Sequence, residues 1–161
     1  MNIFDVHIKN GEVIDGTGAP KFKSDIVIDK GKIIGVFPPE NGDVRDPSEN
    51  HFLSNFKAKH MINAENKIIS PGFIDVHTHD DDNVFLDPSM SSKISQGVTT
   101  CVAGNCGISL APFSYKGEVP APIALLGKSE VFRCPRVNDY KEEFNNKPSS
   151  VNLALLTGHS M

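Results

Sequence analysis

The sequence lacks the features that mark several classes of protein. Its 161 residues include only three cysteines, an odd number without a Cys-x-x-Cys pair, which argues against a disulfide framework. There is no cluster of basic residues and the formal net charge is -4, so nothing indicates nucleic-acid binding. The aliphatic stretches are far too short to cross a bilayer, and no basic region precedes an apolar core near the N-terminus. We therefore expect a cytoplasmic protein that binds neither nucleic acid nor membrane.

Short strand-like segments separated by turn signals occupy the first 37 residues. Residues 4–9 alternate apolar and polar side chains, and Asn10-Gly11 predicts a tight turn after them. Further strand-like segments at 12–15, 25–29 and 32–36 complete a small antiparallel meander. We expect His7 to lie at the surface or edge of this sheet, without a chemical role.

A polar stretch over residues 38–60 predicts an exposed loop. His51 and His60 lie in or beside this stretch, and we expect both to be solvated. Residues 60–64 then predict a small strand that returns the chain to the sheet.

From residue 68 the pattern changes to alternating strands and helices, which is typical of an α/β fold with a parallel sheet. An eight-unit barrel takes about 250 residues, so each unit takes about 30, and the segment from residue 70 to 161 accommodates about three units. Strands are predicted at 74–79, 98–103 and 151–156, with helices from Asp87-Pro88 to Gly97, over 122–132 and over 138–146.

Two histidines stand at the predicted end of the first parallel strand. His77 and His79 are two residues apart, so on an extended strand their side chains share one face, with Asp75 below them. Two imidazoles on one face can bind a divalent metal, and neutral imidazole nitrogen suits zinc. An isolated His-x-His pair is more often a surface feature, but this pair follows a hydrophobic strand.

Cys106 has the corresponding place after the second parallel strand, in the turn Gly104-Asn105-Cys106-Gly107. Catalytic groups on barrels sit at the carboxyl ends of strands, and a thiolate there can bind zinc. The alternative is a buried free cysteine in a glycine-rich turn, which the local sequence by itself favours. We expect Cys101 to lie in the core and Cys134 in a loop without a role.

Five motifs then follow one another in a specific order. They are Asp-Gly-Thr-Gly-Ala-Pro at 15–20, Pro-Gly-Phe-Ile-Asp-Val-His-Thr-His-Asp-Asp at 71–81, Ser-Gln-Gly-Val-Thr-Thr at 95–100, Gly-Asn-Cys-Gly-Ile-Ser-Leu-Ala-Pro at 104–112 and Val-Asn-Leu-Ala-Leu-Leu-Thr-Gly-His-Ser at 151–160. Together they resemble the N-acyl-D-amino-acid deacylases (D-aminoacylases) of the amidohydrolase superfamily. The Gly-Asn-Cys-Gly turn separates this resemblance from dihydroorotases and hydantoinases, which share only His-x-His.

The resemblance implies a fold, a cofactor and a substrate. The family carries a small β-sandwich beside a (β/α)8 metal-dependent hydrolase barrel. This chain would hold the N-terminal part of that α/β architecture, with residues 1–66 as a partial β-sandwich and residues 67–161 as the first three β/α units of an incomplete barrel. The cofactor would be zinc, which activates water to hydrolyse the amide bond of a small N-acyl-D-amino acid.

The resemblance also assigns residues. Cys106 matches the tight zinc ligand, and His77 and His79 match the pair at a second, more weakly held metal position. His159 and Ser160 match a motif near the substrate. Asp75 is either a group that orients the histidines or a structural hydrogen-bonding group.

The family's other zinc ligands and its catalytic aspartate come from later strands, so this sequence supplies no catalytic residue of its own. We expect the chain to be an N-terminal portion of such an enzyme and to be inactive in isolation. Two alternatives stay open: another amidohydrolase, similar to dihydroorotase or hydantoinase, and a non-catalytic barrel fragment that acts as a binding partner. The oligomeric state is open as well.

Overall fold

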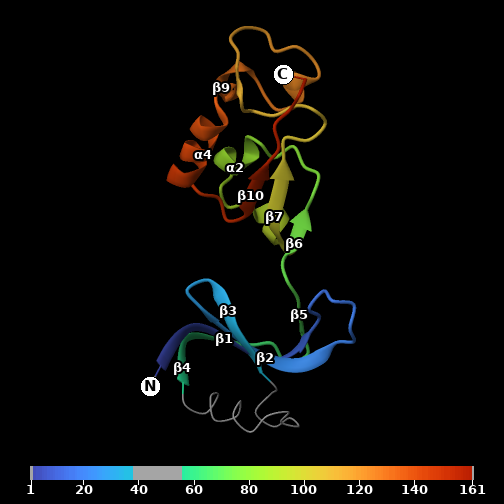
Figure 1. Ribbon diagram of the computed structural model, residues 1–161, viewed down its shortest axis with the longest axis vertical. Helices are drawn as coiled ribbons and strands as arrows, with labels where there is room; N and C mark the ends of the chain where they lie inside the picture. Colours follow the sequence, from blue (N-terminus) through green and yellow to red (C-terminus); the bar gives the residue numbers. More distant parts are fainter. Residues whose placement is uncertain (1, 38–55, 161) are drawn as a thin grey trace. The chain divides into compact units, whose positions relative to one another are not determined.

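The computed structural model describes residues 2–37 and 56–160 and divides the chain into two compact units, residues 1–71 and 72–161 (Figure 1). His51 and most of the predicted loop at 38–60 lie outside the described residues. The strand expected at 60–64 begins earlier, at Phe56. No helix in the described segments is long and apolar enough to cross a membrane.

The first unit is a five-stranded sheet in which β1 is central. The strand order is β3-β2-β1-β4, and β5 also pairs with β1. The pairs β1–β2 and β2–β3 are antiparallel, whereas β4 and β5 run parallel to β1. The bounds are β1 (Asn2–Val13), β2 (Phe22–Asp29), β3 (Lys32–Phe37), β4 (Phe56–Asn63) and β5 (Ile68–Ile69).

The predicted turn at Asn10-Gly11 is wrong, because β1 continues through it. Residues 6–8 pair with 26–28, and residues 11–13 pair with 22–24, so β1 holds one extra residue at the register shift. Asn10 has a φ of 65°, a left-handed conformation that asparagine tolerates. The dipeptide therefore forms a β-bulge within one long strand instead of reversing the chain.

His7 does not lie at the surface. It is 7% exposed, and its Nε2 lies 2.8 Å from Oδ2 of Asp25, which is itself 1% exposed. The other oxygen of Asp25 accepts the backbone N–H of Asn10 at 2.9 Å. This buried pair therefore also supports the bulge.

The second unit contains a parallel sheet in the order β10-β7-β6, as the alternation of strands and helices predicts. The strands are β6 (Phe73–Asp75), β7 (Val98–Ala103) and β10 (Asn152–Leu155). The short strands β8 (Phe113–Ser114) and β9 (Arg133–Cys134) pair antiparallel with each other. Cys134 is therefore a buried strand residue and not part of a loop.

Helices in this unit are shorter than expected, except for the last. Asp87-Pro88 starts no helix: α2 (Asn83–Leu86) ends just before it, and α3 (Ser91–Ile94) begins after it. The predicted helix at 122–132 consists of two 3₁₀ turns, η1 (Ile123–Leu125) and η2 (Ser129–Val131). Gly127, with a φ of 144°, separates them. The helix expected at 138–146 is confirmed as α4 (Val137–Asn146).

A single apolar cluster holds the second unit together. Aromatic rings link its layers: Phe85 of α2 contacts Tyr140 of α4 edge to face, with ring centroids 5.1 Å apart. Cys101 lies in this core, as expected. The buried members of the cluster are Val84, Met90, Cys101, Ile108, Leu110, Ala111, Ile123, Leu126, Phe132, Cys134, Tyr140 and Val151.

Candidate metal centre

The two histidines and Cys106 meet at one end of the parallel sheet. His77 and His79 follow β6, and Cys106 follows β7, so neighbouring parallel strands carry them to the same edge. Beyond the end of β6, the backbone N–H of Thr78 still donates to the carbonyl of Val102 at 3.2 Å. The loop that holds the histidines is therefore attached to the strand that leads to the cysteine.

The donor atoms of His77, His79 and Cys106 all lie within 4.8 Å of one another. Nε2 of His77 is 3.2 Å from Sγ of Cys106, and the two imidazole rings have centroids 6.0 Å apart. In a tetrahedral zinc site, metal–ligand bonds of about 2.05 and 2.3 Å place nitrogen and sulfur about 3.6 Å apart. The 3.2 Å between His77 Nε2 and Cys106 Sγ is close to that spacing, and two imidazoles with a thiolate are donors that zinc accepts.

Burial differs across the three donors. Cys106 and His77 are exposed, whereas His79 is half-buried. The predicted alternative of a buried free cysteine is thus wrong for Cys106. Among the residues that the structure describes, Nδ1 of His79 is buried without a hydrogen-bond partner. A buried imidazole nitrogen without a partner is costly, so a ligand or water molecule near this ring would stabilise it.

The backbone around Cys106 explains the two glycines beside it. Gly104, Cys106 and Gly107 all have positive φ values, of 80°, 57° and 78°. This left-handed run turns the chain sharply at the end of β7, and only glycine adopts it without strain. The Asn105 side chain closes the turn by donating to the carbonyls of Val102 at 2.7 Å and Thr78 at 3.2 Å.

Asp75 does not lie beneath the imidazole rings on a continuous strand, because β6 ends at this residue. Its Oδ1 accepts the backbone N–H of His77 at 3.3 Å, and its Oδ2 lies 2.6 Å from Nζ of Lys93. The hydrogen bond from Lys93 holds the pKa of the Asp75 carboxyl below its usual value. Asp75 therefore contacts the backbone of a candidate ligand and not its ring.

Sequence reasoning missed two residues that connect the loops of the site. Asp81 is fully buried, and its Oδ2 accepts the backbone N–H of Gly104 at 3.3 Å. Burial raises the pKa of this carboxyl. Tyr140 of α4 donates its hydroxyl to the carbonyl of Asp81 at 2.6 Å. An acid run such as 80–82 indicates a solvated loop, so no local signal shows that Asp81 and Asp82 are both buried.

His159 and Ser160 lie beside the Cys106 turn. The N–H of Ser160 donates to the carbonyl of Gly107 at 2.9 Å, and its hydroxyl is 3.0 Å from Nδ1 of His159. A Cβ added at Gly107 would be 3.1 Å from Nε2 of His159 and 2.9 Å from Oγ of Ser160. Because Gly107 has no side chain, the segment after β10 can pack directly against the turn that carries Cys106.

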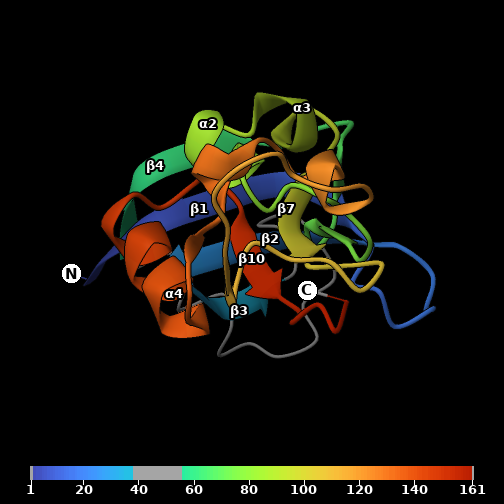
Figure 2. The same cartoon turned by 90° about the horizontal axis from the view of Figure 1, so that it is seen from above.

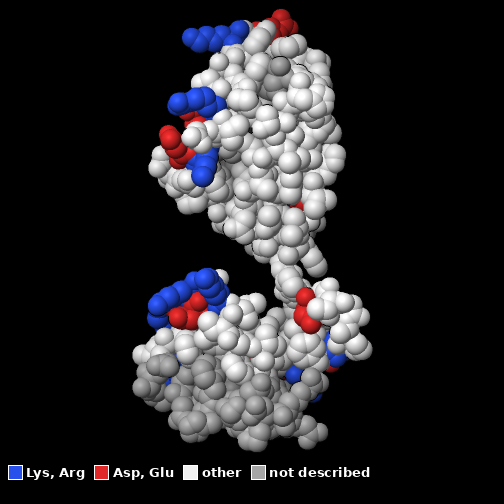
Figure 3. All heavy atoms as spheres, in the orientation of Figure 1, with Lys and Arg blue, Asp and Glu red and all other residues white. Residues whose placement is uncertain are grey.

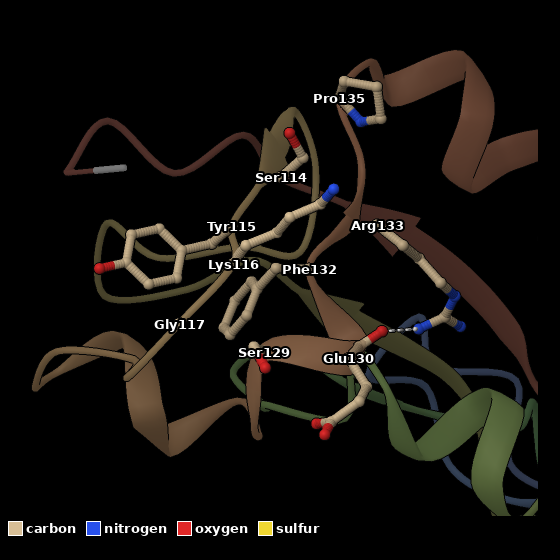
Figure 4. Close-up of a pocket in the computed structure, with 9 residues that line it drawn as sticks. All are labelled: Ser114, Tyr115, Lys116, Gly117, Ser129, Glu130, Phe132, Arg133 and Pro135. Carbon is tan, nitrogen blue, oxygen red and sulfur yellow. Dashed lines mark hydrogen bonds between the residues drawn. The ribbon is translucent and has the colours of Figure 1, made fainter.

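The other sequence-predicted residues lie elsewhere. His60 is exposed on β4, in agreement with the prediction of a solvated histidine. A separate pocket in the second unit is lined by Tyr115, Lys116, Phe132 and Arg133, among others, and none of the three candidate metal ligands lines it (Figure 4). Arg133 donates there to the carbonyl of Glu130 and to the carboxylate of Glu143, so it links β9 to η2 and α4.

Comparison with known proteins identifies the family of this chain. The model of the amidohydrolase family matches residues 60–161. A D-aminoacylase of Alcaligenes xylosoxydans xylosoxydans is 37% identical over 157 residues, which cover 98% of this chain and 29% of that protein. A crystal structure of D-aminoacylase is similar at a TM-score of 0.83 and 41% identity, over 98% of this chain and 30% of the other.

An N-acyl-D-glutamate deacylase from Bordetella bronchiseptica, solved with zinc and a phosphonate inhibitor that mimics the tetrahedral intermediate, is similar at a TM-score of 0.80 and 38% identity. The match covers 97% of this chain and 30% of the deacylase chain. The chain thus spans about 30% of the length of these relatives. Because the family model matches more than half of the chain, and includes the whole candidate metal centre, the chain belongs to the amidohydrolase family.

Proposed function

We propose that this chain is part of a zinc-dependent hydrolase that cleaves the amide bond of N-acyl-D-amino acids. One observation carries the proposal: three donors of the types that zinc prefers come within 4.8 Å of one another at the ends of adjacent parallel strands. The relatives named D-aminoacylase and N-acyl-D-glutamate deacylase indicate the substrate class.

In this proposal Cys106 is the tight zinc ligand, and His77 and His79 bind metal beside it. When bound, zinc would supply Lewis acidity, which lowers the pKa of water and polarises an amide carbonyl. His159 and Ser160 would contact the substrate, because they lie against Gly107 on the exposed side of the turn. Asp75 would hold the His77 backbone in place through its accepted N–H.

The fold belongs to the same proposal. The order β6, β7, β10 across a parallel sheet is that of the first three strands of a (β/α)8 barrel. Phe73, Ile74 and Val76 are 60–69% exposed, and the face of the second unit in Figure 3 is largely uncharged. Further barrel strands would cover these three apolar side chains. Residues 1–66 would then form part of a β-sandwich, and residues 67–161 the first three β/α units.

We expect no turnover by the 161-residue chain alone. Asp75 and Asp80 are both paired with Lys93, and Asp81 is fully buried, so none of these carboxylates beside the histidines is available to move a proton to a leaving amine. Saturable, zinc-dependent hydrolysis of N-acetyl-D-methionine by this chain would contradict that expectation.

The metal centre itself can be tested with cobalt, which replaces zinc and reports a thiolate ligand by a charge-transfer absorption band. We expect the band to appear on titration of the chain and to be lost in Cys106→Ser. His77→Ala should weaken cobalt binding at least tenfold, since it removes one of three donors. His60→Ala, which removes an exposed histidine of the first unit, is the matched control. A band of equal strength in Cys106→Ser would refute the proposed site.

A further inference from the structure

A lysine that sequence reasoning passed over lies at the centre of the loop that carries the histidines. Nζ of Lys93, from α3, is 2.6 Å from Oδ2 of Asp75, 2.9 Å from Oδ2 of Asp80 and 3.4 Å from Oγ1 of Thr78. Thr78 also donates its hydroxyl to Asp80. The helix α3 contacts β7, and Figure 2 labels both elements. One ammonium group thus joins three side chains of a six-residue segment.

The positions that Lys93 contacts alternate with the candidate ligands. It holds residues 75, 78 and 80, and it leaves His77 and His79 free to face Cys106. Asp75 meanwhile accepts the N–H of His77, so the turn at the end of β6 is fixed from both sides. A loop anchored at three points around two imidazoles has few ways to rotate them, and such pre-organisation strengthens metal binding.

The positive charge of Lys93 also offsets the negative charges of Asp75 and Asp80. The side chains of Lys93, Asp75 and Asp80 are only 20%, 29% and 17% exposed, so water screens their charges incompletely. Without the ammonium, the two carboxylates would face each other across one partly buried site and would repel. Each would also become an oxygen donor able to compete for a cation beside the histidines.

We propose that Lys93 is a positioning residue of the metal centre, which presents His77 and His79 to Cys106 by holding Asp75, Thr78 and Asp80. The inference rests on the proposed function, since it assumes that these three donors bind the metal. It assigns Lys93 no contact with metal or substrate.

The test compares cobalt affinity in the wild-type chain, in Lys93→Met and in Lys93→Arg. We expect Lys93→Met to weaken binding about 10- to 100-fold, as loss of a group that supports a metal ligand generally does. Its charge-transfer band at saturating cobalt should also be altered, because the donors are no longer held in one arrangement. Lys93→Arg, which restores a cation and several donors, should recover most of the affinity. Unchanged or tighter binding by Lys93→Met would overturn the inference.

A triple variant separates positioning from simple charge repulsion. Lys93→Met combined with Asp75→Asn and Asp80→Asn removes both unpaired carboxylates, so its free energy of unfolding should return toward the wild-type value. Its cobalt affinity should stay low, because the loop is still not held. Recovery of affinity together with stability would mean that Lys93 only neutralises charge, and would overturn the positioning role.

A metal-free measurement keeps this inference separate from the proposed function. In the wild-type chain His77 Nε2 is 3.2 Å from Cys106 Sγ, so the imidazole protons of His77 should show nuclear Overhauser contacts to the β protons of Cys106. These contacts should disappear in Lys93→Met and persist in the control Lys67→Met, where the lysine is exposed in the first unit. Absence of cobalt binding by the wild type would refute the metal centre, whereas persistent contacts in Lys93→Met would refute the role of Lys93.

Discussion

Gly104 offers a sharp test of how the sheet fixes the metal centre. It has a φ of 80° at the end of β7, and a Cβ built there would lie 2.1 Å from the carbonyl oxygen of Leu156 and 2.8 Å from its carbon. Both neighbours are backbone atoms at the end of β10, so no side chain can rotate away. Replacing Gly104 with alanine must therefore displace β10 or the Cys106 turn.

The expected cost follows from three contributions. An L-residue in the left-handed region costs about 1–2 kcal/mol. The collision breaks the hydrogen bond from Leu156 N to Ala103 O, now 2.9 Å long, which contributes about 1 kcal/mol. Movement of Gly104 also weakens its bond to Asp81. The sum is about 2–4 kcal/mol. This is a large share of the free energy of unfolding of a native domain, which is roughly 5–15 kcal/mol.

Urea denaturation followed by circular dichroism measures this loss, with Gly117→Ala as the control. Gly117 belongs to the same unit and has a φ of 115°, but no atom lies within 4 Å of a Cβ added there. The control thus reports the conformational cost without the collision. Because Cys106 is two residues away, Gly104→Ala should also weaken cobalt binding. A Gly104→Ala cost no greater than that of Gly117→Ala would refute the reasoning.

Two further predictions concern α4. Tyr140→Phe should destabilise the second unit by about 1–3 kcal/mol, because the buried carbonyl of Asp81 loses its donor; urea denaturation would measure this, and an unchanged midpoint would contradict it. The carboxyl of Asp139 should titrate below its usual pKa, because the Arg136 side chain and backbone N–H bond to it. Its contribution to the helix start is therefore present above the unfolded pKa and lost as pH falls through the lowered one. A carbon-13 NMR titration would show this midpoint, which Arg136→Ala should raise.

Several elements followed from the sequence because their signals are local. The β-branched run of β7 and the pattern of α4 each predict their own structure within one residue, and the β/α alternation predicts a parallel sheet. Since parallel strands end at one edge, the same reasoning brings His77, His79 and Cys106 together without any knowledge of the packing.

Local signals failed where more than one structure satisfies them. Asn10-Gly11 suits a hairpin turn or a bulge, and only the pairing of both halves of β1 with β2 selects the bulge. Asp87-Pro88 suits a helix start, but α2 already ends at Asp87. At Asn10-Gly11 a long-range contact, absent from any short window of sequence, determines the outcome.

The sequence by itself determined β7, α4, the parallel pairing in the second unit and the order of the motifs, and it supplied the candidate metal ligands. Only the tertiary structure decided that His7 pairs with buried Asp25, that Asp81 and Asp82 of the acidic run are buried, and that Lys93 contacts the loop of the histidines. The physical reason is that these ion pairs and hydrogen bonds join residues that are 13–59 positions apart in the sequence. Only the folded chain brings such residues into contact.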